Sequence, residues 1–393
     1  MPRSIVIVSA VRTAIGAFGG ALAGHPPTRL GALCVAEALR RAGLPGAEVG
    51  HVVFGNVLIT EPKDAYLGRV AAIEGGIPHE VPAMTVNRLC GSGVQAIVSA
   101  AQAIMLGDCD TAVAGGAETM SRTPHLLQAA RFGQRLGDVA AVDHLTGVLT
   151  DPFGNGIMGI TAETVAERHG VTRAEQDAFA LESQRRAAAA IREGRFRDQI
   201  LPVEVRRGRA TAMFDTDEHP KADTTAEGLA GLRPAFKKDG TVTAGNASGI
   251  NDGAAALVLM AEDAARRRGV PILGRIVGYS HAGVDPGEMG IGPVPAVRNL
   301  LARTGLKAGD FDLVESNEAF AAQACAVSRA LDLDPARVNP NGGAIALGHP
   351  VGATGAILTA KVLYELARTG GRYGLATMCI GGGQGIALAV ERA

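Results

Sequence analysis

One cysteine in this sequence occupies a position at which a thiol could act as a nucleophile. Cys90 follows a short β-prone run at residues 84–86, and a Gly-Ser-Gly step at 91–93 separates it from a run of helix formers over 94–106. In such a strand-to-helix turn the sulfur lies near unpaired N–H groups, which can lower the thiol pKa from its usual value of about 8.5. The glycines let the backbone and a substrate approach closely. A buried structural cysteine would fit the same turn, so this stretch alone leaves both interpretations open.

Strand-like and helix-like segments alternate from the start of the chain, which indicates an α/β fold. Residues 4–10 and 51–57 have the pattern of strands, residues 30–43 that of an amphipathic helix, and residues 110–116 that of a short buried strand. Cys34 falls on the apolar stripe of the helix, and Cys109 immediately precedes the last strand. We therefore expect both cysteines to be structural.

The C-terminal third repeats this order of segments. Most of the matched landmarks lie about 260 residues apart. The matched pairs are 274–280 with 4–10, 312–317 with 52–56, 348–357 with the Cys90 turn, and 373–383 with the strand ending at 116. We predict an internal duplication, with two α/β halves whose equivalent turns carry Cys90 and His349.

Composition sets the broad class of the protein. The chain has 393 residues, 47% of them hydrophobic and 20% charged, which suffices for two domains or one large duplicated fold. The formal net charge of −1 gives no indication of a nucleic-acid partner.

The five cysteines are odd in number and include no C-x-x-C pair, which argues against a disulfide framework or a zinc site and favours a reducing compartment. The apolar run at the N-terminus is interrupted by Arg12 and resembles a first strand more than a signal peptide. No apolar run is expected to approach the ~18 residues of a membrane span. These features predict a soluble, cytoplasmic protein with no membrane partner and no metal.

A long stretch with a different sequence pattern separates the halves, roughly from residue 118 to 248. Thr172 and Glu175 form a capping-box pattern that opens a helix through about residue 193, with its apolar side chains (Phe179, Leu181, Ile191) inside and its charges outside. Gly- and Pro-rich loops surround this helix. A long loop-rich insertion is usually functional, and we expect a lid over a substrate channel. Lys221, Arg233, Lys237 and Lys238 could meet an anionic substrate there, although most of them are expected to be solvated.

Three C-terminal stretches accompany Cys90: Asn317-Glu-Ala-Phe320, the Gly-rich run over 341–355 that contains His349, and the Gly-rich run over 378–385 that contains Cys379. Each is ambiguous alone. The last run lacks the spacing of both common phosphate-binding loops.

Together with Cys90, these stretches resemble the thiolase family, the acetyl-CoA acetyltransferases and 3-ketoacyl-CoA thiolases. The resemblance spans the whole chain and implies an α/β thiolase fold, with duplicated halves that form a five-layer α-β-α-β-α core plus an inserted loop domain. It places the N-terminal half at 1–119 and 249–271, the loop domain for coenzyme A binding and oligomer contacts at 120–248, and the C-terminal half at 272–393. It also implies a homotetramer, or in some members a homodimer.

The resemblance implies a role for each catalytic residue. Cys90 would attack the acyl carbon and form an acyl-enzyme, and His349 would take or share its proton. Cys379 would act as the general base on the α-carbon of acetyl-CoA. One oxyanion hole would be His349 with a water held by Asn317, and the other the backbone N–H groups of Cys90 and Gly381. The substrates would be acyl-CoA thioesters and coenzyme A, with no further cofactor and no metal.

The resemblance also implies a coenzyme A groove and an acyl pocket. The residues expected to contact the substrate are Leu149, Met158, Lys221, Ala235, Phe236, Ala244, Ala247, Ser248, Met289 and Phe320. The chain departs from short-chain biosynthetic members at Ile157, where they carry histidine, at Lys221, where arginine is usual, and at Gly228, where serine is usual. The apolar Ile157 puts acetoacetyl specificity in doubt, whereas Lys221 keeps the charge but loses the planar guanidinium.

The predicted function is the reversible Claisen condensation of acetyl-CoA with an acyl-CoA. The main alternative is a degradative thiolase for medium- or long-chain 3-ketoacyl-CoA. A ketoacyl synthase is disfavoured because Cys379 and Asn317 stand where that family uses two histidines. A thiolase-like lipid-binding protein without activity is disfavoured because the whole catalytic set is present. Oxidation that bridges Cys90 and Cys379 would regulate such an enzyme rather than replace it.

Overall fold

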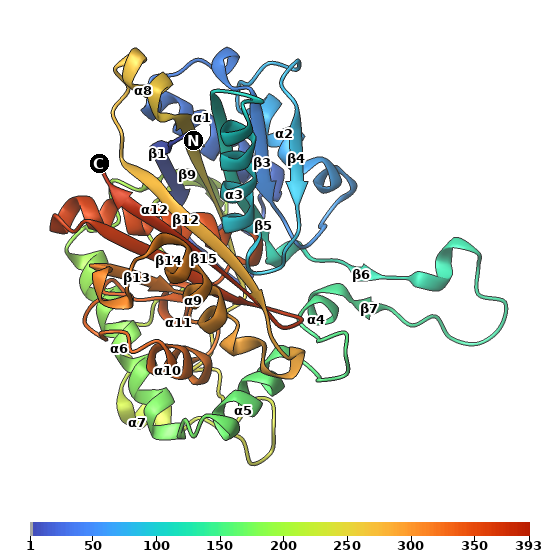
Figure 1. The fold of residues 1–393 in the computed structure, drawn as a ribbon. Coiled ribbons are helices and arrows are strands. Elements are labelled where there is room, and N and C mark those ends of the chain that lie inside the picture. Colours follow the sequence, from blue (N-terminus) through green and yellow to red (C-terminus); the bar gives the residue numbers. More distant parts are fainter. Residues whose placement is uncertain (1–2) are drawn as a thin grey trace.

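A computed structural model describes residues 3–393 and contains one continuous mixed sheet (Figure 1). Its main strands run in the order β13-β14-β15-β12-β1-β11-β5-β3-β4. The first four belong to the C-terminal part of the chain: β13 (Leu313–Ser316), β14 (Tyr373–Ile380), β15 (Gln384–Arg392) and β12 (Gly274–Gly283). The other five are β1 (Ile5–Thr13), β11 (Asn251–Ala261), β5 (Thr111–Thr119), β3 (His51–Gly55) and β4 (Ala83–Val86).

The two groups of strands are joined weakly. Strands β1 and β12 pair only at Val6 with Arg275 and at Ile7 with Gly274. By contrast, β1 pairs with β11 from Ile5 to Arg12. The hydrogen-bonded sheet is therefore continuous, but it consists of two halves that meet at a short joint.

Helices complete five layers around the two half-sheets. Helices α1 (Pro27–Ala42) and α2 (Leu67–Glu74) cover the outside of the N-terminal half-sheet, and α9 (Pro293–Thr304) covers the outside of the C-terminal one. Helices α3 (Ser92–Leu106) and α12 (Val351–Thr369) pack against each other between the half-sheets. All of α12 from Val351 to Leu363 is buried, as expected for a helix covered on all sides, and only its last turn is exposed. The expected α-β-α-β-α core is confirmed.

One expectation about apolar runs is wrong. The 18-residue stretch Leu89–Leu106 is apolar and long enough to meet the criteria for a membrane span. More than half of it is buried in the fold, because α3 lies between β3, β5 and α12. Its hydropathy is that of a central core helix.

The predicted duplication is confirmed by topology. Strands β1, β3, β5 and β11 recur as β12, β13, β14 and β15 with the same neighbours, and α3 recurs as α12. The pairing register is the same in both halves: Gly55 pairs with Gly116, and Ser316 with Thr377, so the partner lies 61 residues further on in each case. The sequence comparison matches the residue after Gly55 with the residue after Ser316. Asn56 is therefore equivalent to Asn317, and Glu118 to Cys379.

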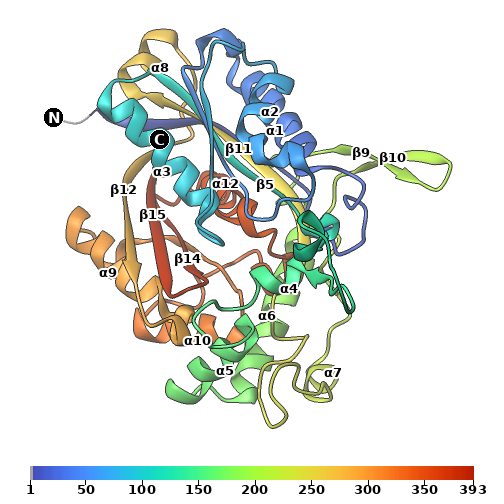
Figure 2. The ribbon, with the colours of Figure 1, turned by 90° about the vertical axis from the view of Figure 1, so that its right-hand side faces the viewer.

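The stretch between β5 and β11 contains one long helix, α6 (Arg173–Arg192), several short elements and two projecting hairpins. Strands β6 (His125–Leu126) and β7 (Val142–Asp143) form the base of one hairpin, which extends far from the body in Figure 1. Strands β9 (Val203–Arg207) and β10 (Ala210–Phe214) form the other, seen at the side of Figure 2. The remaining elements are α4 (His144–Val148), α5 (Met158–Arg168), β8 (Ile200–Leu201) and α7 (Ala226–Ala230).

Other short elements complete the chain. They are β2 (Gly16–Ala17), α8 (Glu262–Arg268), α10 (Ala321–Ala330) and α11 (Ala344–Leu347). Helix α10 begins directly after Asn317-Glu-Ala-Phe320, and α11 precedes the turn that carries His349.

Candidate active site

A cavity of about 80 Å³ lies where the starts of α3 and α12 approach the C-terminal end of β14. Cys90, His349, Cys379 and Gly381 all line it, although they are far apart in the sequence. Leu149, Met158, Ser248, Met289 and Phe320 were also expected at the substrate site and line the same cavity. Its other lining residues are Leu89, Val148, Ala319 and Val351, which the sequence analysis did not identify. In the sequence each of the four is only an apolar residue in or beside a motif, and nothing further marks it as a site residue.

The Cys90 turn is tight and partly strained. Leu89 adopts a left-handed conformation (φ 45°), which is costly for a non-glycine residue. The turn is closed by Ser92, whose hydroxyl donates to the Leu89 carbonyl at 2.7 Å and accepts from the Arg88 N–H at 2.8 Å. These bonds fix the backbone on both sides of Cys90.

The glycines beside Cys90 serve packing within the protein. A Cβ at Gly91 would lie 2.5 Å from the Ile380 side chain, and one at Gly93 would lie 2.5 Å from the Ala356 nitrogen. On the opposite helix, a Cβ at Gly355 would lie 2.3 Å from the Val94 nitrogen. The predicted close approach of the backbone is confirmed: Gly93 and Gly355 let α3 and α12 cross in contact, and Gly91 makes room for Ile380 of β14. The close approach of a substrate stays a prediction.

Burial controls the ionisation of all three reactive groups. It raises the pKa of Cys90 to about 11, and the N–H groups of Gly381 and of Cys90 itself oppose this only in part. It also raises the pKa of Cys379, with a further contribution from Cys90. It lowers the pKa of His349 to about 4. The expected lowering of the Cys90 pKa by N–H groups at this turn is present, but desolvation is the larger effect, so the net shift of the pKa is upward.

His349 is oriented by contacts on its backbone and on both ring nitrogens. Its backbone N–H donates to Oδ1 of Asn251 at 3.0 Å. The Asn251 amide in turn donates to the Gly16 carbonyl at 3.0 Å. Its Nδ1 lies 2.6 Å from Oγ1 of Thr354, and its Nε2 lies 3.4 Å from Nδ2 of Asn317. Asn251 and Thr354 were missed by the sequence analysis, although Thr354 lies within the Gly-rich run that contains His349.

Asn317 follows β13 and is buried behind His349 rather than lining the cavity. Its N–H donates to the Thr377 carbonyl at 2.9 Å, which fixes it beside β14. Among residues 3–393, its Oδ1 has no hydrogen-bond partner. Asn317 and Cys379 thus approach the site from adjacent strands.

The run after Cys379 forms the turn between β14 and β15. Gly382 and Gly383 have φ angles of 79° and 82°, which favour glycine. A Cβ at Gly383 would lie 2.3 Å from the Val284 carbonyl oxygen. Gly382 and Gly383 therefore allow a tight turn. The N–H of the preceding Gly381 faces the Cys90 sulfur.

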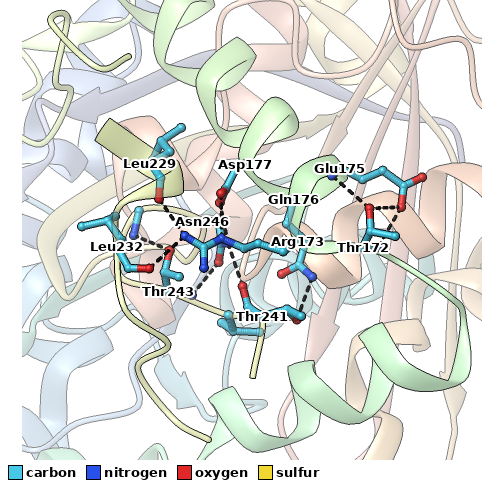
Figure 3. A network of polar contacts seen from close by, with 12 residues as sticks. Thr172, Arg173, Glu175, Gln176, Asp177, Leu229, Leu232, Thr241, Thr243 and Asn246 are labelled. Atoms are coloured by element: carbon cyan, nitrogen blue, oxygen red, sulfur yellow. Dashed lines mark hydrogen bonds and ion pairs between the residues drawn. The ribbon is translucent and has the colours of Figure 1, made fainter. Parts of the chain in front are cut away.

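A buried polar network connects α6 to the loops beside the cavity (Figure 3). Arg173 donates to Asp177 at 2.6 Å and to the Leu229 carbonyl at 2.7 Å. Asn246 donates to the other oxygen of Asp177 at 2.9 Å. The Asn246 carbonyl accepts from the N–H of Ala321, the first residue of α10. The network joins α6, the end of α7 and the loop over residues 241–248.

This network corrects one expectation for α6. Its predicted capping box is confirmed, since Thr172 and Glu175 bond reciprocally. Its buried face, however, includes four polar side chains, Gln176, Asp177, Ser183 and Gln184. The expected arrangement of apolar residues inside and charges outside holds only in part. The buried polar side chains bond to polar partners around the helix, for example Asp177 to the Asn246 amide and Ser183 to the Glu318 carboxylate.

The remaining expected substrate residues lie in two places. Phe236 packs edge-on against Phe320 with ring centroids 6.1 Å apart, and Ala247 forms a bridge with Phe320. Ala235 donates to the Val242 carbonyl at 2.9 Å beside them. Lys221 and Ala244 instead line a second, open cavity of about 290 Å³, together with Gly228. Ile157 is the residue before α5, and its neighbour Met158 lines the catalytic cavity.

Among residues 3–393, no cluster of three or more His, Cys, Asp or Glu side chains is arranged to hold a metal ion.

Comparison with known proteins identifies the family. Residues 5–263 match the thiolase N-terminal domain, and residues 270–392 match the thiolase C-terminal domain. The chain is 61% identical to beta-ketothiolase BktB of Cupriavidus necator over all of both chains. It is 52% identical to an acetyl-CoA acetyltransferase of Pseudomonas aeruginosa, over 99% of this chain and 100% of the relative.

Solved structures agree with this assignment. Human mitochondrial 3-ketoacyl-CoA thiolase matches with a TM-score of 0.97 at 46% identity, covering 100% of this chain and 99% of the other. An acetyl-CoA acetyltransferase from Bacillus anthracis matches with a TM-score of 0.98 at 48% identity, with the same coverage. The chain, with its duplicated halves and its paired cysteines, belongs to the thiolase family.

Proposed function

We propose that this protein is an acyl-CoA C-acyltransferase that catalyses the reversible Claisen condensation of acetyl-CoA with an acyl-CoA. The observation that carries the proposal is the meeting of Cys90, His349 and Cys379 in one apolar cavity. Two thiols and an imidazole supply a nucleophile and two groups that can move protons, which is what the reaction needs.

In the first half-reaction, the Cys90 sulfur attacks the acyl carbon and its proton passes to His349. Burial keeps both groups neutral in the resting site, so the proton transfer accompanies the attack instead of preceding it. The intermediate collapses, coenzyme A leaves with the proton from His349, and the acyl group remains on Cys90. The N–H groups of Cys90 and Gly381 face the sulfur and would stabilise the negative oxygen of the intermediate.

The second half-reaction requires Cys379 as the thiolate, so its proton must first be released to solvent against the raised pKa. The thiolate then removes an α-proton from acetyl-CoA, and the resulting enolate attacks the acyl carbon on Cys90. A water held by Asn317 and by the Nε2 lone pair of His349 would donate to the enolate oxygen and stabilise it. The new C–C bond forms as the Cys90 sulfur is released, and that sulfur takes up the proton from Cys379, which restores the thiol of Cys90. In thiolysis the same steps run in reverse, with Cys379 returning a proton to the departing enolate.

We assign coenzyme A binding to the inserted segment 120–248. Its residues Met158 and Ser248 line the catalytic cavity, and Lys221 and Ala244 line the second, open cavity. Phe236 and Ala247 contact Phe320, which lines the catalytic cavity, and Ala235 directly precedes Phe236. The two thiolase halves would then be residues 1–119 with 249–271, and residues 272–393.

The first experiment is the coenzyme A-dependent cleavage of acetoacetyl-CoA beside a medium- or long-chain 3-ketoacyl-CoA. A higher kcat/KM for acetoacetyl-CoA would make the protein an acetyl-CoA acetyltransferase. A higher kcat/KM for the longer substrate would support a degradative thiolase, with the apolar Ile157 as part of the reason. Cleavage of neither substrate would contradict the proposal and favour a thiolase-like lipid-binding protein.

We further propose a cytoplasmic homotetramer, or a homodimer. The β6–β7 hairpin carries strongly exposed apolar side chains, with Leu127 52%, Phe132 93% and Leu136 89% exposed. Large exposed apolar groups on a projecting segment are typical of protein–protein contacts. Analytical ultracentrifugation of the wild type and of Phe132→Ser tests this, because the substitution should lower the assembled mass. A wild-type monomer would contradict it.

A further inference from the structure

The imidazole of His349 is held at both nitrogens by contacts of different kinds. Nδ1 meets the Thr354 hydroxyl at 2.6 Å, and Nε2 meets the Asn317 amide nitrogen at 3.4 Å. All three side chains are buried. Burial also keeps the resting ring neutral, so that it carries one proton. The position of that proton decides whether Nε2 can accept or donate.

Thr354 directs its own proton away from the ring. Its hydroxyl donates to the Pro350 carbonyl oxygen at 2.9 Å, the back-bond of a helical threonine to the fourth residue before it. Since a hydroxyl has one proton, the remaining contact of Oγ1 with Nδ1 must have Nδ1 as the donor. On the other side of the ring, the Asn317 amide presents an N–H group, which requires a lone pair on Nε2. Two independent contacts therefore favour the same tautomer.

We propose that Thr354 is a positioning residue that holds His349 as the Nδ1–H tautomer and so keeps the Nε2 lone pair available for the Cys90 proton. When the sulfur bonds to the acyl carbon, its proton moves to Nε2 and the carbonyl electron pair moves to oxygen. The imidazolium then has two N–H groups, one on Thr354 and one able to donate to that oxygen. When coenzyme A leaves, it takes the Nε2 proton and the original tautomer returns. The kinetic part of this proposal rests on the proposed function.

The tautomer can be measured without any activity. In protein labelled with [15N]histidine, magic-angle-spinning NMR distinguishes protonated from bare ring nitrogens, and the loss of signals in His349→Asn assigns those of His349. We expect the proton on Nδ1 at neutral pH in the wild type. A proton on Nε2 in the wild type would overturn the proposal. Because this measurement needs no turnover, its failure is distinguishable from failure of the proposed function, in which the wild type would transfer no acyl group.

The kinetic test uses a matched pair in α12. Thr354→Val keeps the side-chain volume and removes the hydroxyl. Thr359→Val makes the same change at a buried threonine whose hydroxyl donates only to the Gly355 carbonyl, at 2.8 Å. Acyl-enzyme formation is followed as the single-turnover release of coenzyme A from acetyl-CoA.

We expect Thr354→Val to slow this step about 10²-fold, in the range of lost general-base catalysis. Thr359→Val and Thr354→Ser should stay within about 3-fold of the wild type, since the serine keeps the hydroxyl. Equal rates for Thr354→Val and Thr359→Val would overturn the proposal, as would a folded Thr354→Ser that is as slow as the valine variant. If Thr354→Val does not fold, the serine variant and the wild-type NMR measurement still decide it.

Discussion

The two halves of the protein use the same pair of equivalent positions for different purposes: hydrogen bonding in one half and a place at the catalytic site in the other. In the N-terminal half, Asn56 and Glu118 bond to each other at 3.0 Å, and Glu118 also accepts the N–H groups of Val57, Leu58 and Gly352. In the C-terminal half, the equivalent positions are Asn317 and Cys379. There the longer carboxylate is replaced by a shorter thiol, and Cys379 lines the catalytic cavity.

This difference shows how one fold supplies both support and chemistry. Glu118 receives a bond from Gly352 in the first turn of α12, so the N-terminal half secures the helix that follows His349. In the C-terminal half the equivalent residue is Cys379, whose thiol lines the cavity instead of joining a network of hydrogen-bonded side chains. Polar groups that satisfy one another stabilise a structure, whereas a reactive group must remain available to a substrate.

The largest expected effect comes from substitution of the two cysteines. Cys90→Ser should lose nearly all activity, and Cys379→Ala should lower the condensation rate by about 10³-fold or more, because the α-proton has no base. Cys379→Ala should still form the acyl-enzyme, which mass spectrometry detects after incubation with acetyl-CoA. Rapid condensation by Cys379→Ala would contradict the role assigned to the C-terminal position.

Substitution of Glu118 should act on stability instead. Glu118→Gln places an amide N–H among groups that are all donors, leaving buried N–H groups without an acceptor. We expect the free energy of unfolding to fall by about 2–4 kcal/mol. Denaturant titration measures this against Glu182→Gln, which removes the charge of a half-exposed partner of Arg186 and should cost less than about 1 kcal/mol. Equal stabilities of the two variants would show that the Glu118 network does not stabilise the contact between the N-terminal half and the start of α12.

The smallest effect is expected from a substitution in the inserted segment, whose loops belong to neither half. Asp177→Ala removes the shared acceptor of Arg173 and Asn246, so the loop over residues 241–248 should lose its fixed position. We expect KM for coenzyme A to rise about tenfold, equivalent to ~1.4 kcal/mol, with kcat changed less than about 3-fold. Steady-state kinetics beside Glu182→Ala, on the exposed face of the same helix, provides the control. A fall in kcat with unchanged KM would place Asp177 in the chemistry instead of in binding.

The sequence predicted the features that local pattern and repetition encode. The strand–turn–helix at Cys90, the capping box of α6 and the repeated order of segments all correspond to elements of the structure. Short-range propensity and spacing decide such elements, and the tertiary structure did not override them here.

What the sequence could not predict depends on contacts across the two halves. The raised pKa of Cys90 comes from burial between elements hundreds of residues apart, which outweighs the local helix terminus. The partner of the His349 N–H, Asn251, lies 98 residues away in the chain. The polar side chains on the buried face of α6 make sense only beside the loops that they bond. Periodicity carries no information about any of these partners.

The crossing of α3 and α12 at Gly93 and Gly355 has a consequence for how this architecture could arise. Cys90 and His349 precede the starts of these two helices, so they lie at positions related by the pseudo-symmetry of the duplication. An ancestor built from two identical copies of one half would necessarily place the same residue at both helix starts. A nucleophile and a base at these two positions require copies that differ in sequence, as the two halves of this one chain do. The contact between the helix starts is therefore symmetric in its backbone and asymmetric in its chemistry.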